Sequence, residues 1–305
     1  MSSPDTAPAP PLRDAATVII ARPAVSGFEV FMVRRSRESS FMPSIHVYPG
    51  GALDPQDCEE HVLAHITGMT ADEAGRRLGM PDEPMKAVGL FLAGVRESFE
   101  EAGFLLAKRA GEEDWIDLTS DPEVAARFEG YRARLNAYEM SMAQLLEEED
   151  LYIPIDKVGY FARWITPFFE KKRFDARFFV TYAPKNQRPL HDDREATQSE
   201  WIAPSVALAR YVAGEFELAP PTISTLTRLA RFGSVMSLER AARTYNPPAL
   251  LPHFMAVDDA MTLVLPGDSL YPTDDERYAI GGVGSPWTRM VSRDGTWEIV
   301  TRDHA

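Results

Sequence analysis

The amino-acid sequence predicts an α/β protein. β-Branched and aromatic residues gather in 15–21 and 28–34, which favours two early strands. The segment 86–102 has apolar residues at helical spacing, and aromatic-rich, strand-like segments follow at 161–166 and 173–182. A chain of 305 residues can bury a sizeable core, so we expect these elements to form one enlarged domain over residues 14–305.

The first two strands are expected to form a β-hairpin, because a serine and a glycine stand between them. A short helix is predicted at 71–78. Thr70 is its candidate N-cap, and Glu73 stands three residues later, as in a capping box. Gly79 follows the helix and is expected to end it.

The helix predicted at 86–102 turns an apolar face inward, and residues 104–107 are expected to re-enter the sheet. The residues of that inward face are Ala87, Leu90, Phe91, Gly94, Val95, Ser98 and Phe99.

Later segments are predicted to be helical: 121–149, 202–213 and 222–244, the last broken near Gly233. Short closing strands are expected at 263–268 and 295–300. We treat residues 222–305 as a C-terminal extension of helices and short strands.

Charge and composition narrow the class of protein. A formal net charge of −14 argues against a nucleic-acid binder, because a polyanion is repelled by most of such a surface. The basic run 171–173 can supply local positive charge for a small anionic substrate. Cys58 is the single cysteine, which excludes an internal disulfide and favours a cytoplasmic location. We expect a flexible tail at 1–13 and no membrane span.

The most informative feature of the chain is the run from Arg96 to Gly103, R-E-S-F-E-E-A-G. Glu97, Glu100 and Glu101 stand at i, i+3 and i+4, so they share one helix face. Carboxylates gathered in this way repel one another unless a cation lies among them, and Mg²⁺ or Mn²⁺ prefers such oxygen ligands. The alternative is a solvated acidic stripe on a surface helix.

This run and the upstream Tyr48-Pro49-Gly50-Gly51 together resemble the Nudix box, whose pattern is G-x(5)-E-x(7)-R-E-U-x-E-E-x-G-U, with U an aliphatic residue. Three departures are visible. Asp57 stands in place of the first glutamate, Ser98 occupies an aliphatic position, and 38 residues separate the two halves where the pattern has seven. Residues 58–86 therefore form an insertion within the box.

A box divided in this way resembles the Nudix subgroup that includes the peroxisomal coenzyme A diphosphatases. Later segments match the same subgroup: W-x-T-P at 164–167, R-F-D-x-x-F-F at 173–179, W-x-x-P-x-x-A-L at 201–208 and P-P-T at 220–222.

The resemblance implies an α/β/α sandwich with a mixed sheet, a helical insertion and extra C-terminal helices. It also implies that Glu97, Glu100 and Glu101 form the group that binds Mg²⁺ or Mn²⁺, with Glu100 and Glu101 as direct ligands and Glu97 as a further ligand or a group that helps to activate water. Arg96 would orient a glutamate, and Glu97, Glu101 and Arg96 are the catalytic candidates of this run. Asp57 acts through water or shapes its loop.

Further candidates lie outside the acidic run. Gly50 and Gly51 offer backbone carbonyls near substrate and metal. Glu195 is the candidate general base from a later loop, with His191 as a rival. Trp164 and Arg173 are candidate substrate-binding residues, although aromatic side chains in such segments are often part of the core.

The expected activity is metal-dependent hydrolysis of a nucleoside diphosphate linked to another group. The subgroup favours coenzyme A or acyl-CoA, which would give 3′,5′-ADP and phosphopantetheine. ADP-ribose, NADH and other nucleotide diphosphates are alternative substrates, and the protein is a possible homodimer. Two other classes stay open: a non-catalytic Nudix-fold sensor of nucleotides or protein partners, and an acidic helical scaffold.

Overall fold

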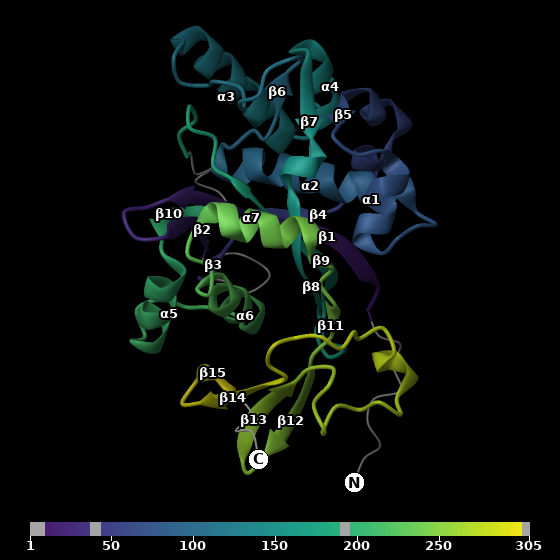
Figure 1. The fold of residues 1–305 in the computed structure, drawn as a ribbon, viewed down its shortest axis with the longest axis vertical. Coiled ribbons are helices and arrows are strands. Elements are labelled where there is room, and N and C mark those ends of the chain that lie inside the picture. The colour runs from purple at the N-terminus through teal and green to yellow at the C-terminus, as the bar shows by residue number, and fades with distance from the viewer. Residues whose placement is uncertain (1–9, 37–43, 190–195, 301–305) are drawn as a thin grey trace. The chain divides into compact units, whose positions relative to one another are not determined.

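The computed structural model describes residues 10–36, 44–189 and 196–300 (Figure 1). The chain divides into two compact units. The larger unit comprises residues 15–162 and 177–247, and the smaller unit comprises residues 1–14, 163–176 and 248–305. Among the described helices, none is both long enough and apolar enough to span a membrane.

The main sheet has strands in the order β10-β2-β1-β9-β8, with β3 beside β2 and β4 beside β1. Most of its residues belong to the larger unit, and β1, β8 and β9 have residues in both units. The strands are β1 (Leu12–Pro23), β2 (Phe28–Arg35), β3 (His46–Val47), β4 (Gly50–Ala52), β8 (Gly159–Ile165), β9 (Arg173–Tyr182) and β10 (Ala196–Ile202). β1 and β2 pair antiparallel, with Ala21 opposite Val30, which confirms the predicted hairpin. β1 begins at Leu12, inside the segment expected to be a flexible tail, whose residues 1–9 lie outside the described residues.

Neighbouring residues of β9 face opposite sides of this sheet, as strand geometry requires. The ring of Phe179 lies 4.6 Å from that of Phe91 on α2 (Pro84–Ala102). The ring of Phe178 lies 6.5 Å from that of Tyr48, whose hydroxyl is 3.4 Å from Thr225 on α6 (Pro220–Leu229). Helices therefore cover both faces, which confirms the α/β/α arrangement.

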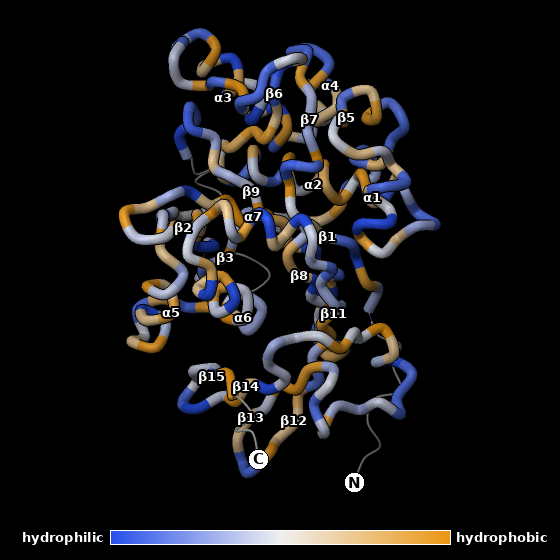
Figure 2. Tube along the Cα trace, in the orientation of Figure 1, coloured by the Kyte–Doolittle hydropathy of each residue, from blue (hydrophilic) through white to orange (hydrophobic). Residues whose placement is uncertain are grey.

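The helix α2 is buried on every side over residues 87–95, and Figure 2 shows the hydrophobic character of this segment. A helix that is apolar all round is a core helix. All seven residues expected to face inward are buried. The helix ends at Gly103, whose φ of 73° is the left-handed conformation that glycine adopts readily.

The insertion is helical, as predicted. It contains the 3₁₀ helix Glu60–His65, the short strand β5 (Ile66–Thr67) and α1 (Ala71–Leu78). The side chain of Thr70 accepts from the backbone N–H of Glu73, and the Glu73 side chain accepts from the Thr70 N–H. The predicted capping box is therefore confirmed, and Gly79 ends the helix with φ 69°.

Two sequence-based expectations were wrong. Residues 104–107 form no strand, although all four are buried. The strand that follows, β6 (Lys108–Arg109), belongs to a separate sheet of the order β5-β7-β6, with β7 at Leu151–Pro154. Ile202 ends β10, which was not predicted, so α5 begins only at Pro204 and runs to Val212.

The remaining helices of the larger unit match their predicted positions. These are α3 (Pro122–Asn136), α4 (Met142–Glu148) and α7 (Val235–Thr244). The break expected near Gly233 separates α6 from α7.

The smaller unit contains an antiparallel sheet of the order β12-β13-β14-β15. Its strands are β12 (His253–Val257), β13 (Ala260–Val264), β14 (Arg289–Arg293) and β15 (Thr296–Val300). The closing strand predicted at 295–300 is confirmed as β15. The strand predicted at 263–268 is misplaced: it overlaps β13 only at Leu263 and Val264, and residues 265–268 form no strand. Both observed strands belong to this separate sheet. The short strand β11 (Ala249–Leu250) pairs in parallel with Arg163 and Trp164 of β8.

Candidate active site

The acidic end of α2 lies directly against the glycine strand β4. A Cβ atom added to Gly51 would lie only 2.5 Å from Cδ and 2.6 Å from Oε2 of Glu97. Ordinary van der Waals contact begins near 3.4 Å, so only a residue without a side chain leaves the carboxylate in this place. The absence of a side chain at Gly51 therefore provides the space that the Glu97 carboxylate occupies.

Gly50 has two roles in the same strand. Its backbone N–H donates to Oε2 of Glu101 at 2.9 Å, which ties that carboxylate to β4. A Cβ atom at Gly50 would lie 2.5 Å from the carbonyl oxygen of Ala16 and 2.7 Å from Cα of Thr17. Because these are backbone atoms of β1, Gly50 is required for the close approach of the two strands.

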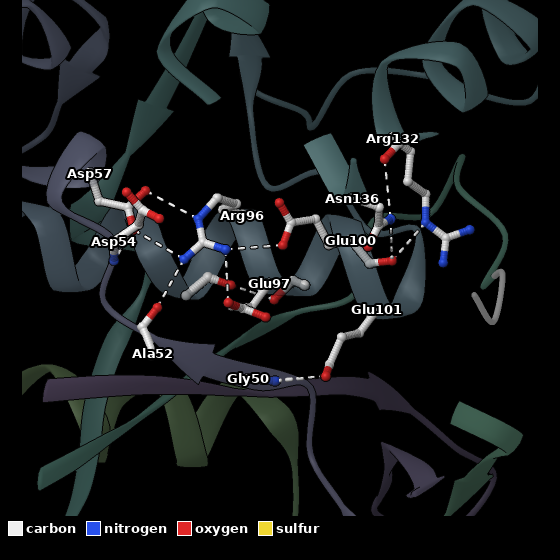
Figure 3. A network of polar contacts seen from close by, with 12 residues as sticks. Gly50, Ala52, Asp54, Asp57, Arg96, Glu97, Glu100, Glu101, Arg132 and Asn136 are labelled. Carbon is white, nitrogen blue, oxygen red and sulfur yellow. Dashed lines mark hydrogen bonds and ion pairs between the residues drawn. The ribbon is translucent and has the colours of Figure 1, made fainter. Parts of the chain in front are cut away.

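The side chains of Asp57, Glu97, Glu100 and Glu101 gather near the C-terminal end of α2, and we call them the acidic cluster. Arg96 bonds to three of them, and Figure 3 shows its contacts. Its Nη1 donates to Glu97 at 2.8 Å and to Glu100 at 3.0 Å. Its Nε and Nη2 donate to the two oxygens of Asp57 at 3.2 and 3.1 Å, and Nη2 also donates to the carbonyl oxygen of Ala52 at 3.0 Å. All five guanidinium N–H groups are engaged. Arg96 therefore positions carboxylates, as the sequence predicted, and is not available to bind substrate.

Asp57 is the aspartate found where the box pattern has a glutamate. It lies in the 3₁₀ helix Pro55–Cys58, and one of its oxygens accepts from the backbone N–H of Asp54 at 3.0 Å. Its side chain is buried and makes two bonds to Arg96. Asp57 thus shapes the loop and holds Arg96, and the two halves of the divided box meet at this ion pair.

The 3₁₀ helix packs closely on α2. A Cβ atom at Gly89 would lie 2.5 Å from Sγ of Cys58 and 3.1 Å from the carbonyl oxygen of Asp57. Ser98, the residue in the aliphatic position of the box, is fully buried and donates its hydroxyl to the carbonyl of Gly94 at 2.8 Å. Its polar group is satisfied within the helix, so it fits a buried position.

The Arg96 guanidinium is bonded to three carboxylates, those of Asp57, Glu97 and Glu100, which leaves an excess of negative charge. Burial raises the pKa of Glu97 to about 7; Arg96 opposes this shift, and the nearby charge of Glu100 adds to it. Burial also raises the pKa values of Glu100 and Asp57, against the influence of Arg96. The arrangement therefore favours additional positive charge.

This donor set fits a hard divalent cation, because it offers buried carboxylate oxygens and too little positive charge. In the described part of the chain, no group of three or more His, Cys, Asp and Glu side chains is arranged to hold a metal ion. Arg96 lies between Glu97 and Glu100, while Glu101 turns to Gly50. The metal-binding roles of the three glutamates stay predictions.

Two of the other candidate residues belong to the smaller unit. Trp164 is buried, and its indole N–H has no hydrogen-bond partner among the described residues. Arg173 is also buried and donates to the carbonyl oxygens of Thr166 at 3.1 Å and Pro10 at 3.4 Å. These contacts of Arg173 are structural, and a role of either residue toward substrate stays a prediction.

Glu195 and His191 lie outside the described residues, so the identity of the general base stays a prediction. Two contacts near the cluster were not foreseen. Arg132 and Asn136 of α3 donate to the backbone carbonyl of Glu100 at 2.9 and 3.4 Å. No local signal in 122–136 indicates this contact, because it depends on how α3 packs beside α2.

The family of the chain follows from comparison with known proteins. A family model described as the NUDT19 Nudix domain matches residues 75–229, half of the chain, including the whole run from Arg96 to Gly103. The chain belongs to this Nudix family. The first half of the box, with Gly50, Gly51 and Asp57, precedes the matched segment.

Similar proteins agree with this assignment. The acyl-coenzyme A diphosphatase NUDT19 of Homo sapiens is 28% identical over 287 residues, which cover 83% of this chain and 75% of that protein. The putative nudix hydrolase 7 of Caenorhabditis elegans is 26% identical over 261 residues, 85% of this chain and 74% of that protein.

The crystal structure of a Nudix hydrolase from Alicyclobacillus acidocaldarius has a TM-score of 0.61 and 26% identity. The match covers 78% of this chain and 98% of that one. The predicted Nudix fold and the class of enzyme, a Nudix hydrolase, are therefore confirmed.

Proposed function

We propose that this protein hydrolyses the diphosphate linkage of coenzyme A or its acyl thioesters, with Mg²⁺ or Mn²⁺ as cofactor. The products are 3′,5′-ADP and phosphopantetheine or its acyl form. The observation that carries the proposal is the group of acidic side chains at the C-terminal end of α2. Glu97 and Glu100 accept from Arg96, Glu101 accepts from the Gly50 N–H, and Glu97 occupies the space beside Gly51. The relatives named acyl-coenzyme A diphosphatases support the substrate class.

In the proposed reaction, a water oxygen forms a bond to one phosphorus of the diphosphate. The P–O bond to the bridging oxygen breaks, and the proton that the water loses goes to a basic group of the site. A bound divalent cation would supply charge neutralisation and a more acidic bound water. Glu97, Glu100 and Glu101 would hold that cation, and Arg96 donates to Glu97 and Glu100, which would keep the two carboxylates in a fixed orientation.

Turnover of a substrate panel tests this proposal. The purified protein is incubated with Mg²⁺ or Mn²⁺ and coenzyme A, acyl-CoA, ADP-ribose, NADH or diadenosine polyphosphates, and the products are identified by mass. Glu101→Gln removes a carboxylate but keeps an oxygen that accepts from the Gly50 N–H. Glu147→Gln makes the same chemical change at an exposed position of α4 and serves as the matched control.

We expect metal-dependent release of 3′,5′-ADP from coenzyme A, lost in Glu101→Gln and retained in Glu147→Gln. Preferential release of AMP from ADP-ribose or NADH would replace the coenzyme A assignment with that alternative. Full activity of Glu101→Gln would show that the site lies elsewhere. Metal-dependent turnover of no panel member, with ligand binding intact, would favour the non-catalytic sensor.

A further inference from the structure

A cavity of about 230 Å³ lies beside the C-terminal end of α2, within the larger unit. Phe99 and Gly103 of α2, Ala125, Phe128, Glu129 and Arg132 of α3, and Leu118, Thr119 and Arg188 line it. The cavity lies close to the acidic cluster along the chain, because Phe99, which lines the cavity, directly precedes Glu100 of the cluster. It is also close in space, because Arg132 donates to the Glu100 carbonyl at 2.9 Å.

Hydrogen bonds fix the walls of this cavity. Gln187, next to Arg188, is buried and makes three bonds: its amide oxygen accepts from the Leu105 N–H, and its amide nitrogen donates to the carbonyls of Leu105 and Ile116. Asp117 accepts from the backbone N–H groups of residues 119 and 120. These bonds tie the residue next to Arg188 to the segments at Leu105 and Ile116, and they close the turn that carries Leu118 and Thr119.

The chemistry of the lining is mixed. Phe99, Leu118, Ala125 and Phe128 give apolar surface, while Glu129, Arg132 and Arg188 bring two guanidinium groups and one carboxylate. The rings of Phe99 and Phe128 meet edge to face, with centroids 6.5 Å apart and an interplanar angle of 77°. Two such rings form no parallel slot for a flat base. The lining suits a flexible, largely aliphatic chain with an anionic group at one end.

The size of the cavity limits what it holds. Sites for whole drug-sized ligands span roughly 300–1,000 Å³, so a cavity of about 230 Å³ accommodates only part of an extended substrate. Its neighbour, the acidic cluster, is the proposed position of the diphosphate. A group covalently attached to that diphosphate is therefore the natural occupant.

We propose that this cavity is the subsite for the non-nucleotide arm of the substrate, the pantetheine chain, and that Arg132 and Arg188 lie on the side of its phosphate. This inference rests on the proposed function, because it assumes a diphosphate held at the acidic cluster. The arm is flexible, branched and mostly aliphatic next to its phosphate, which matches the irregular apolar walls better than a purine does.

Filling the cavity tests the inference. Ala125→Leu adds three carbons at a half-buried lining position of α3 and removes no contact, and leucine is a strong helix former. Ala126→Leu adds the same atoms at the next, exposed position and is the matched control. Binding of 4′-phosphopantetheine and of 3′,5′-ADP, each with Mg²⁺, is measured by calorimetry for both variants and the unchanged protein. Turnover of coenzyme A is followed separately.

We expect Ala125→Leu to weaken 4′-phosphopantetheine binding about tenfold, equivalent to about 1.4 kcal/mol, and to leave 3′,5′-ADP binding unchanged. Ala126→Leu should change neither. Ala125→Val, a smaller change, should give an intermediate loss and replaces Ala125→Leu if that variant does not fold.

Equal 4′-phosphopantetheine binding by all variants, or none by the unchanged protein, would overturn the subsite, as would selective weakening of 3′,5′-ADP. If coenzyme A is hydrolysed in these cases, the proposed function stands without the subsite. If 4′-phosphopantetheine binds as expected but coenzyme A is not hydrolysed, only the proposed reaction fails.

Discussion

Gly51→Ala should separate catalysis from stability in this protein. The added Cβ would clash with both carboxylate oxygens and with Cδ of Glu97, and Oε1 is the nearest of these atoms, so the carboxylate must move by about 1 Å to reach ordinary contact. Displacements of about 1 Å in a catalytic constellation cost on the order of 100-fold in rate. We therefore expect kcat for coenzyme A hydrolysis to fall about 100-fold. The unfolding free energy should change by less than about 1 kcal/mol, because the clash is with the end of a side chain.

Gly50→Ala is the matched comparison, since the same methyl group there meets backbone atoms of Ala16 and Thr17. This variant should lose about 1–3 kcal/mol of unfolding free energy through overpacking. Urea unfolding gives the stabilities, and mass detection of 3′,5′-ADP gives the rates. If kcat of Gly51→Ala stays within about threefold of the kcat of the unchanged protein, the observed position of Glu97 has no bearing on catalysis, and the proposed role of Glu97 is refuted.

Three further predictions concern stability, each measured by urea unfolding. Asp57→Glu restores the residue of the box pattern but adds a methylene group beside Arg96 at a buried position, so it should cost about 1–3 kcal/mol; unchanged stability would show that the loop has room for glutamate. Gln187→Leu should cost about 3 kcal/mol or more, because it leaves three buried backbone groups of Leu105 and Ile116 unpaired; a neutral effect would mean that water or other groups replace these bonds. Burial lowers the pKa of His46 from 6.5 to about 4. Between these pH values His46 binds a proton in the unfolded chain but not in the folded protein, so the unfolding free energy falls as the pH drops from 6.5 toward 4. The loss should approach about 3 kcal/mol relative to His46→Phe, which retains an aromatic ring beside Phe216 but cannot titrate; parallel pH profiles of the two proteins would contradict it.

The sequence predicted best where local chemistry decides the structure. The capping box of Thr70 and Glu73 and the buried face of α2 depend only on residues within a few positions of each other. Residues 104–107 were assigned wrongly because a short apolar run does not distinguish a strand from a buried irregular segment. β10 was missed because its sequence, A-T-Q-S-E-W-I, has few apolar residues, and its pairing with β2 comes from the sheet.

The same division applies to the candidate site. The spacing predicted that Glu97, Glu100 and Glu101 share one face of the helix. In the structure Glu97 and Glu100 accept from Arg96, whereas Glu101 accepts from the Gly50 N–H, and a shared metal site stays a prediction. The contact between Arg96 and Asp57 was harder to predict, because 38 residues separate them in the sequence and only the fold brings them together. The cavity beside α3 gave no sequence signal, since its lining comes from four separate segments with no shared motif.

The divided box has a consequence for the order in which the protein folds. Closing a loop of 38 residues between Asp57 and Arg96 costs about 1.5 kcal/mol more entropy than closing one of seven. Such distant contacts tend to form after local helices. We therefore expect α2 to form early and the acidic site to assemble on the native side of the folding barrier.

Stopped-flow kinetics of Asp57→Asn would show this order as faster unfolding with an unchanged folding rate. Slower folding would mean instead that the Asp57–Arg96 contact belongs to the folding nucleus. In the expected case, the Asp57–Arg96 contact controls how long the assembled site persists and has little effect on how quickly the chain folds.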